Sequence, residues 1–243
     1  MSLTPDPQPH DPPWGPLSTI AWTLTALLIG VLVASGFYAI WAGDQARPAN
    51  AMSDGVLIAV GTFISTPVQL GIVVFASQLR RWQPVDYLGL APPRRVEMMI
   101  ALIFIIGLNL VFDVILYSTG REVVPTFQVE AWRTAVDAGW LVWLLLAIII
   151  VAPIGEEIVF RGFLYRGLAK PGWEVHAIGA IALAWALLHI QYDWLGTAQI
   201  FLAGLVLGWF RWASGSTLLT IAMHILINLQ SMIETWIKME YFS

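Results

Sequence analysis

The sequence has no cysteine and few charged residues among its 243 positions. The lack of cysteine excludes disulfide bonds, thiolate metal ligands and a cysteine nucleophile. Soluble globular chains carry about 25% charged residues, whereas this one carries 12%. No basic run indicates a nucleic-acid partner, and no Asn-x-Ser/Thr sequon is present. These absences exclude an ordinary soluble or nucleic-acid-binding protein.

Apolar residues dominate instead, at 58% of the chain. A helix needs ~20 mostly apolar residues to cross a lipid bilayer, and several runs reach that length. The fold class predicted is therefore all-α, a polytopic transmembrane helical bundle of about seven spans, with six to eight allowed. We expect one membrane domain over 17–243, with spans near 17–42, 55–79, 96–118, 139–165, 173–190, 195–212 and 217–237.

The N-terminal segment 1–16 carries six prolines and few apolar residues. Such a segment buries too little surface to order itself, so we predict a disordered tail rather than a signal peptide. Arg80, Arg81, Arg94 and Arg95 share one short loop, which the positive-inside rule places in the cytoplasm. Alternating spans then put the N-terminus in the cytoplasm as well. The expected location is the plasma (inner) membrane.

Charged residues interrupt the apolar run near 139–165, which holds Glu156, Glu157 and Arg161. A charged side chain at membrane depth costs at least ~2.5–3.5 kcal/mol on insertion scales, so three together indicate function. The third span carries a second polar pair, Asn109 and Asp113, four residues apart. That pair could line a cavity, but a role in helix packing is favoured.

Three of the predicted spans bring polar residues to a similar depth. At ~1.5 Å of rise per residue, Glu156 lies ~15 Å and His189 ~22 Å from the cytoplasmic ends of their segments. By the same count His224 lies ~13 Å deep and Asn228 ~19 Å. The hydrocarbon half-thickness is ~15 Å. The count therefore predicts that these side chains meet near the middle of the membrane.

The same residues fall into three motifs. These motifs read Glu156-Glu157-Ile158-Val159-Phe160-Arg161, Trp185-Ala186-Leu187-Leu188-His189 and His224-Ile225-Leu226-Ile227-Asn228. In this pattern the chain resembles the CAAX protease and bacteriocin-processing family (CPBP, or Abi) of intramembrane proteases, related to the type II CAAX prenyl endopeptidases. The resemblance covers Trp143 to Asn228, with a catalytic core expected at about 139–238. Trp185 is a departure, because this motif usually begins with phenylalanine.

The resemblance implies an endopeptidase that hydrolyses peptide bonds of membrane-associated substrates, with prenylated and bacteriocin-like peptides as candidates. In the family, Glu156 and His189 are the positions expected to activate water. His224 and Asn228 would then stabilise the oxyanion. The lipid bilayer and a membrane-associated peptide or protein are the expected partners.

The two adjacent glutamates receive different expected roles. Arg161 follows Glu157 by four residues, a spacing that suits an ion pair fixing Glu157. Glu156 is then the reactive carboxylate and Glu157 its support. A metal-dependent version stays open, in which Glu156, His189 and His224 bind a divalent metal such as zinc and leave one position for water.

Non-catalytic interpretations remain beside the protease. His224 and Asn228 could serve as hydrogen-bonding residues between helices, in a membrane scaffold or a bacteriocin-immunity protein. A proton-coupled transporter could use the two histidines and Glu156 as a relay. It is less favoured because the sequence shows no inverted repeat. A site-2-type zinc protease is excluded because no His-Glu-x-x-His motif occurs.

Overall fold

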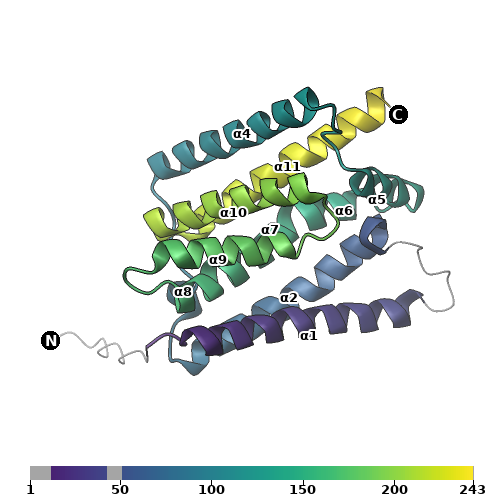
Figure 1. Ribbon diagram of the computed structural model, residues 1–243. Helices are drawn as coiled ribbons and strands as arrows, with labels where there is room; N and C mark the ends of the chain where they lie inside the picture. Colours follow the sequence, from purple (N-terminus) through teal and green to yellow (C-terminus); the bar gives the residue numbers. More distant parts are fainter. Residues whose placement is uncertain (1–11, 43–50, 243) are drawn as a thin grey trace.

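The computed structural model describes residues 12–42 and 51–242, and over these ranges its regular elements are all helical (Figure 1). The predicted all-α bundle is therefore confirmed. The single long helices are α1 (Pro16–Ala42), α2 (Gly55–Leu79), α4 (Arg95–Ser118), α10 (Trp194–Ser214) and α11 (Thr217–Tyr241). The shorter elements are a 3-10 helix (Ala51–Ser53), α3 (Pro84–Tyr87), α5 (Thr126–Asp137) and α9 (Glu174–Leu187).

Five segments within the described ranges are long and apolar enough to cross a membrane: Pro16–Trp41, Gly55–Leu79, Arg95–Ser118, Leu141–Leu168 and Thr217–Tyr241. The predicted fifth and sixth spans correspond to α9 and α10, which run beside each other in the same bundle (Figure 1). At 14 residues, α9 is only ~21 Å long. Together these helices agree with about seven spans, although the fifth is shorter than the sequence indicated.

We call the segment Leu141–Leu168 the broken helix, because two π-helical stretches interrupt its α-helical hydrogen bonding. It consists of α6 (Leu141–Leu146), a π-helix (Ala147–Val151), α7 (Ala152–Glu157), a second π-helix (Ile158–Leu164) and α8 (Tyr165–Leu168). Short π-helical turns are rare and occur frequently at functional sites. The second π-helix begins immediately after the two glutamates, so the backbone is irregular where the sequence is most polar.

Pro153 affects the backbone hydrogen bonds of the first π-helix. The Ala152 N–H bonds to the Ala147 carbonyl, five residues back. In that register the Ile148 carbonyl would accept from residue 153, but proline has no N–H. The Asn228 amide Nδ2 donates to the Ile148 carbonyl instead, at 2.7 Å. A side chain of α11 thus satisfies a backbone group that the broken helix leaves free.

The start of α1 is held against the end of α2. The Trp14 indole donates to the Ala76 carbonyl at 2.9 Å, and its backbone N–H donates to the Tyr87 hydroxyl at 3.2 Å. Residues 1–11 of the expected disordered tail lie outside the described residues, while its last residues are anchored by Trp14.

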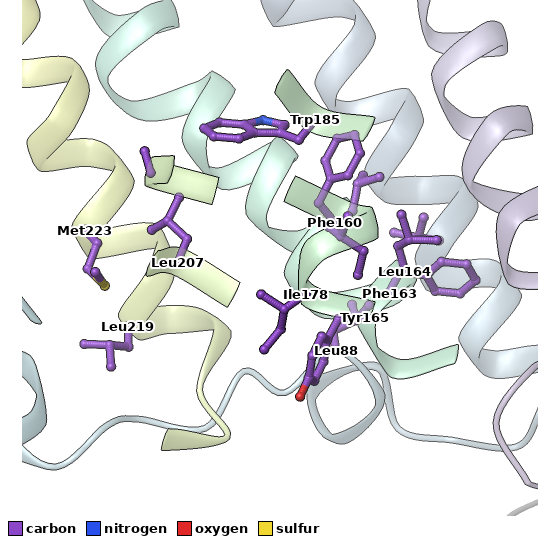
Figure 2. Close-up of a cluster of buried hydrophobic side chains, with 14 of the residues drawn as sticks. Leu88, Phe160, Phe163, Leu164, Tyr165, Ile178, Trp185, Leu207, Leu219 and Met223 are labelled. Atoms are coloured by element: carbon purple, nitrogen blue, oxygen red, sulfur yellow. The ribbon is translucent and has the colours of Figure 1, made fainter. Parts of the chain in front are cut away.

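The main core packs the broken helix against α2, α9, α10 and α11 (Figure 2). Leu88, from the loop after α3, is inserted into this core, and Trp185 of α9 is also part of it. The N-terminal end of α11 is hydrogen-bonded to that loop, because the Thr217 hydroxyl donates to the Leu88 carbonyl at 2.6 Å. The Ser216 hydroxyl similarly donates to the Ala91 carbonyl. The core therefore fixes α9 and α11 beside the helix that carries the glutamates.

Candidate active site

The Glu157 side chain is fully buried, and both Arg161 and His224 contact its carboxylate. Arg161 Nη1 donates to Glu157 Oε1 at 2.9 Å, which is the ion pair that the four-residue spacing predicts. His224 Nδ1 lies 2.9 Å from the same oxygen. The exposed fractions of the Glu157 and Arg161 side chains are 0% and 1%. Since isolated buried charges are strongly unfavourable, each of these two ions depends on the other.

Glu156 lies in a different environment although it is the next residue. Its side chain is half-buried and lines a cavity of about 380 Å³. The Trp185 indole Nε1 donates to Glu156 Oε2 at 2.6 Å. From the sequence, Trp185 is only an unusual aromatic residue at the start of a motif. Nothing in the sequence predicts its hydrogen bond to the expected reactive carboxylate.

His189 lies outside the helix that was expected to hold it. The sequence predicted a span to residue 190, but α9 ends at Leu187. The next two N–H groups bond three residues back, Leu188 to the Trp185 carbonyl and His189 to the Ala186 carbonyl, which tightens and terminates the helix. His189 Nδ1 lies 2.8 Å from the Trp185 carbonyl. Because a carbonyl only accepts, Nδ1 carries the hydrogen of the neutral ring and Nε2 is left as the acceptor.

His224 and Asn228 lie one turn apart on α11, as the sequence predicts. The His224 ring packs edge-on against the Trp185 ring, with 5.3 Å between centroids. Its Nδ1–H is directed at the Glu157 carboxylate. The Asn228 amide uses one hydrogen on the Ile148 carbonyl, and its second hydrogen is not needed for that bond. Asn228 therefore links α11 to the broken helix, and its second amide N–H is not used in that bond.

Two adjoining cavities connect these residues. His189, His224 and Asn228 line both the cavity of about 380 Å³ and a second one of about 420 Å³. Glu156 lines the first cavity, together with Tyr192 from the loop before α10. Burial raises the pKa of the Tyr192 hydroxyl to about 12, with the negative charge of Glu156 adding to the shift. The four predicted residues thus face shared space.

Asn109 and Asp113 also face that space. Both line the second cavity, and their hydrogen bonds to α11 also give them the packing role that the sequence favours. They are linked to Gln230 of α11, whose Nε2 donates to Asp113 Oδ2 at 3.1 Å and to Glu234 Oε1 at 2.9 Å. The Asn109 amide contacts Gln230 Oε1 at 3.4 Å. This polar group joins α4 to α11 at the far wall of the cavity.

The alternative zinc ligands do not form a metal-binding set as they lie. Within the described ranges, no three His, Cys, Asp or Glu side chains are grouped suitably for a metal ion. His224 Nδ1 is directed at Glu157, and Glu156 Oε2 accepts from the Trp185 indole. His189 Nδ1 is taken by a carbonyl. Each candidate ligand therefore already has a protein partner on one of its polar atoms.

Comparison with known proteins agrees with the motifs. The family model described as type II CAAX prenyl endopeptidase Rce1-like matches residues 138–230, a stretch that contains all three motifs. The resemblance to the CAAX protease family is confirmed for this part of the chain. The matched stretch is similar to intramembrane proteases of the CAAX type in general.

The chain is similar to an uncharacterized 24.3 kDa protein from Escherichia coli, with 36% identity over 83 residues. The match covers 33% of this chain and 38% of the relative, so well under half of either length is shared. No solved structure matches the chain.

Proposed function

We propose that the protein is an intramembrane endopeptidase that hydrolyses peptide bonds of membrane-associated substrates, with water activated by Glu156 and His189. The observation that carries this proposal is the convergence of the three motifs on one cavity. Glu156 on α7, His189 in the loop after α9, and His224 and Asn228 on α11 all line the same space. The family match over residues 138–230 supports the reaction class.

The first step would be removal of a proton from water. The Trp185 indole occupies Glu156 Oε2, and Oε1 is the oxygen left for water. His189 presents Nε2, because its Nδ1 is tied to a carbonyl. A water held between these two acceptors gives its proton to Glu156, and its oxygen attacks the carbonyl carbon of the peptide bond. General base catalysis of this kind contributes typically ~10²–10⁴-fold to the rate.

The second step needs donors for the developing oxyanion. The Glu157 carboxylate holds the His224 ring through Nδ1, and an Nε2–H on this ring would donate to the oxyanion. The free amide hydrogen of Asn228 is the second donor. Removal of one such donor costs ~3–4 kcal/mol in well-studied cases. The tetrahedral intermediate collapses when the C–N bond breaks, and Glu156 returns its proton to the leaving amine.

The substrate class follows from the location of the site and from the family. The cavity lies among membrane-spanning helices, so peptides that carry an apolar anchor are the expected substrates, prenylated and bacteriocin-like peptides among them. We place the N-terminus in the cytoplasm of a plasma (inner) membrane. Four arginines in the loop between α2 and α4 support this orientation. Arg80 Nε also donates to the Pro12 carbonyl, so the start of α1 lies beside that loop.

The experiment is peptide cleavage by the purified protein in detergent or liposomes. Glu156→Gln and His189→Ala should abolish cleavage while the protein keeps its thermal unfolding temperature. Glu240→Gln and His176→Ala are matched controls, because both side chains are exposed and neither lines the two cavities. Full activity in both active-site variants would overturn the proposal. A cellular phenotype that survives both substitutions would point to a non-catalytic scaffold or immunity protein.

A further inference from the structure

Trp185 contacts four of the six residues that the motifs identify. Its indole Nε1 donates to Glu156 at 2.6 Å, and its backbone carbonyl accepts from His189 at 2.8 Å. Its ring packs edge-on against the His189 ring at 5.0 Å and against the His224 ring at 5.3 Å. The Arg161 guanidinium lies 4.4 Å from the ring centroid.

Only one of these contacts needs tryptophan. The carbonyl is common to every residue, and phenylalanine also presents a ring for edge-on packing and for a guanidinium. A hydrogen bond from the side chain to Glu156 requires the indole N–H, which phenylalanine lacks. The departure from the usual phenylalanine therefore adds a donor aimed at the expected reactive carboxylate.

The surroundings of the indole fix its position. The side chain is 4% exposed, so the N–H has little access to water as an alternative partner. Gly204 of α10 leaves room for the ring, because a Cβ there would lie 3.2 Å from Trp185 Cε3. The Arg161 guanidinium also lies over the ring, 4.4 Å from its centroid. A buried donor held in this way orients its acceptor strongly, since leaving it unpaired is costly.

The contact also determines which oxygen of Glu156 can react. Because Oε2 is bound by the indole, rotation of the carboxylate about its last bond would break a buried hydrogen bond. The same residue fixes the tautomer of His189 through its carbonyl. One residue thus orients both groups that would share the water.

We propose that Trp185 is a positioning residue of this site, whose indole N–H locks the Glu156 carboxylate so that Oε1 faces the water shared with His189. The inference rests on the proposed function, because it assigns a role within the same reaction. The motif alone does not imply this role, because phenylalanine at this position would keep the ring packing but lack the N–H that bonds to Glu156.

The hydrogen bond can be tested without any activity. In protein labelled with ¹⁵N-tryptophan, each of the thirteen tryptophans gives one indole N–H cross-peak, and the peak lost in Trp185→Phe is that of Trp185. A short bond to a carboxylate should place this proton downfield. In Glu156→Ala the peak should move upfield while the other indole peaks stay in place. An unmoved peak would overturn the inference.

Kinetics test the positioning role. Trp185→Phe should lower kcat on the order of 10–100-fold, the cost of a misplaced catalytic group, with KM unchanged, measured per folded monodisperse protein. Trp209→Phe is the matched control, because Trp209 is 53% exposed on α10 and lines neither cavity. An unchanged kcat in Trp185→Phe would refute positioning even if the indole peak responds. If Glu156→Gln itself keeps full activity, the proposed function fails instead, and the indole peak still decides the contact.

Discussion

Glu156 and Glu157 are adjacent in sequence, yet they belong to two differently built regions. The buried region, formed by Glu157 and Arg161, is closed to solvent, and hydrogen bonds of 2.9 Å join Glu157 to Arg161 and to His224. The cavity region around Glu156 and His189 opens onto about 380 Å³ of space. Buried charge pairs make rigid supports, whereas a reactive carboxylate must have room for substrate and water. This contrast supports the proposed division of the two carboxylates, with Glu157 as the support and Glu156 as the reactive group.

The largest effect should follow a change on the cavity side. Glu156→Gln keeps the shape of the side chain and still accepts from the Trp185 indole, so the unfolding temperature should stay close to that of the unaltered protein. Loss of the general base should lower kcat by ~10²–10⁴-fold. Cleavage kinetics and thermal unfolding of the same preparation check both parts. A variant that loses stability rather than activity would reverse the assignment of the two glutamates.

On the buried side the main effect should be on stability. Arg161→Leu removes the guanidinium partner of the buried Glu157 carboxylate, and breaking a buried pair costs ~3–5 kcal/mol. Adding Glu157→Gln to Arg161→Leu should recover part of that loss, because the orphaned charge is then removed. Unfolding by denaturant in detergent micelles measures both variants. If the double variant is no more stable than the single one, the Arg161 side chain contributes mainly through packing.

A smaller effect should come from the broken helix between the two regions. Pro153→Ala supplies an N–H that can bond to the Ile148 carbonyl in the π-helical register, in competition with Asn228. We expect a change in stability of about 1 kcal/mol, the size of one hydrogen bond, and a modest loss of activity. Asn228→Ala should lose more activity than Pro153→Ala, because it also removes the proposed oxyanion donor. Equal losses in cleavage assays would limit Asn228 to holding the helices together.

Sequence reasoning predicted the elements that rest on periodicity and spacing. The bounds of α2 agree with the predicted span, and the ion pair of Glu157 with Arg161 follows from a four-residue spacing on one helix. Counting helical rise was enough to bring Glu156, His224 and Asn228 to one cavity. These features are local or depend only on the length of helices, so a single sequence contains them.

What the sequence did not predict depends on contacts between segments. Apolar residues continue past Leu187, but the helix ends there and leaves His189 in a loop. Pro153 signals a break, whereas the π-helical register of the residues before it is visible only in the structure. The indole of Trp185 could have faced many acceptors. Its bond to Glu156 exists because α9 packs beside the broken helix.

The smallest effect is expected from the removal of metal ions, which tests whether the two regions share a metal site. A zinc ion bound by Glu156, His189 and His224 would use Glu156 Oε1 and Nε2 of the two histidines, but these side chains are not grouped for it, and the described residues contain no three-ligand group. We therefore expect cleavage to persist after prolonged dialysis against a chelator, with metal content by mass spectrometry well below one per chain. The control is a zinc protease of known dependence treated in parallel. Loss of activity that zinc restores would show that Glu156, His189 and His224 move together to bind the metal, with His224 binding through Nε2 while its Nδ1 stays at Glu157.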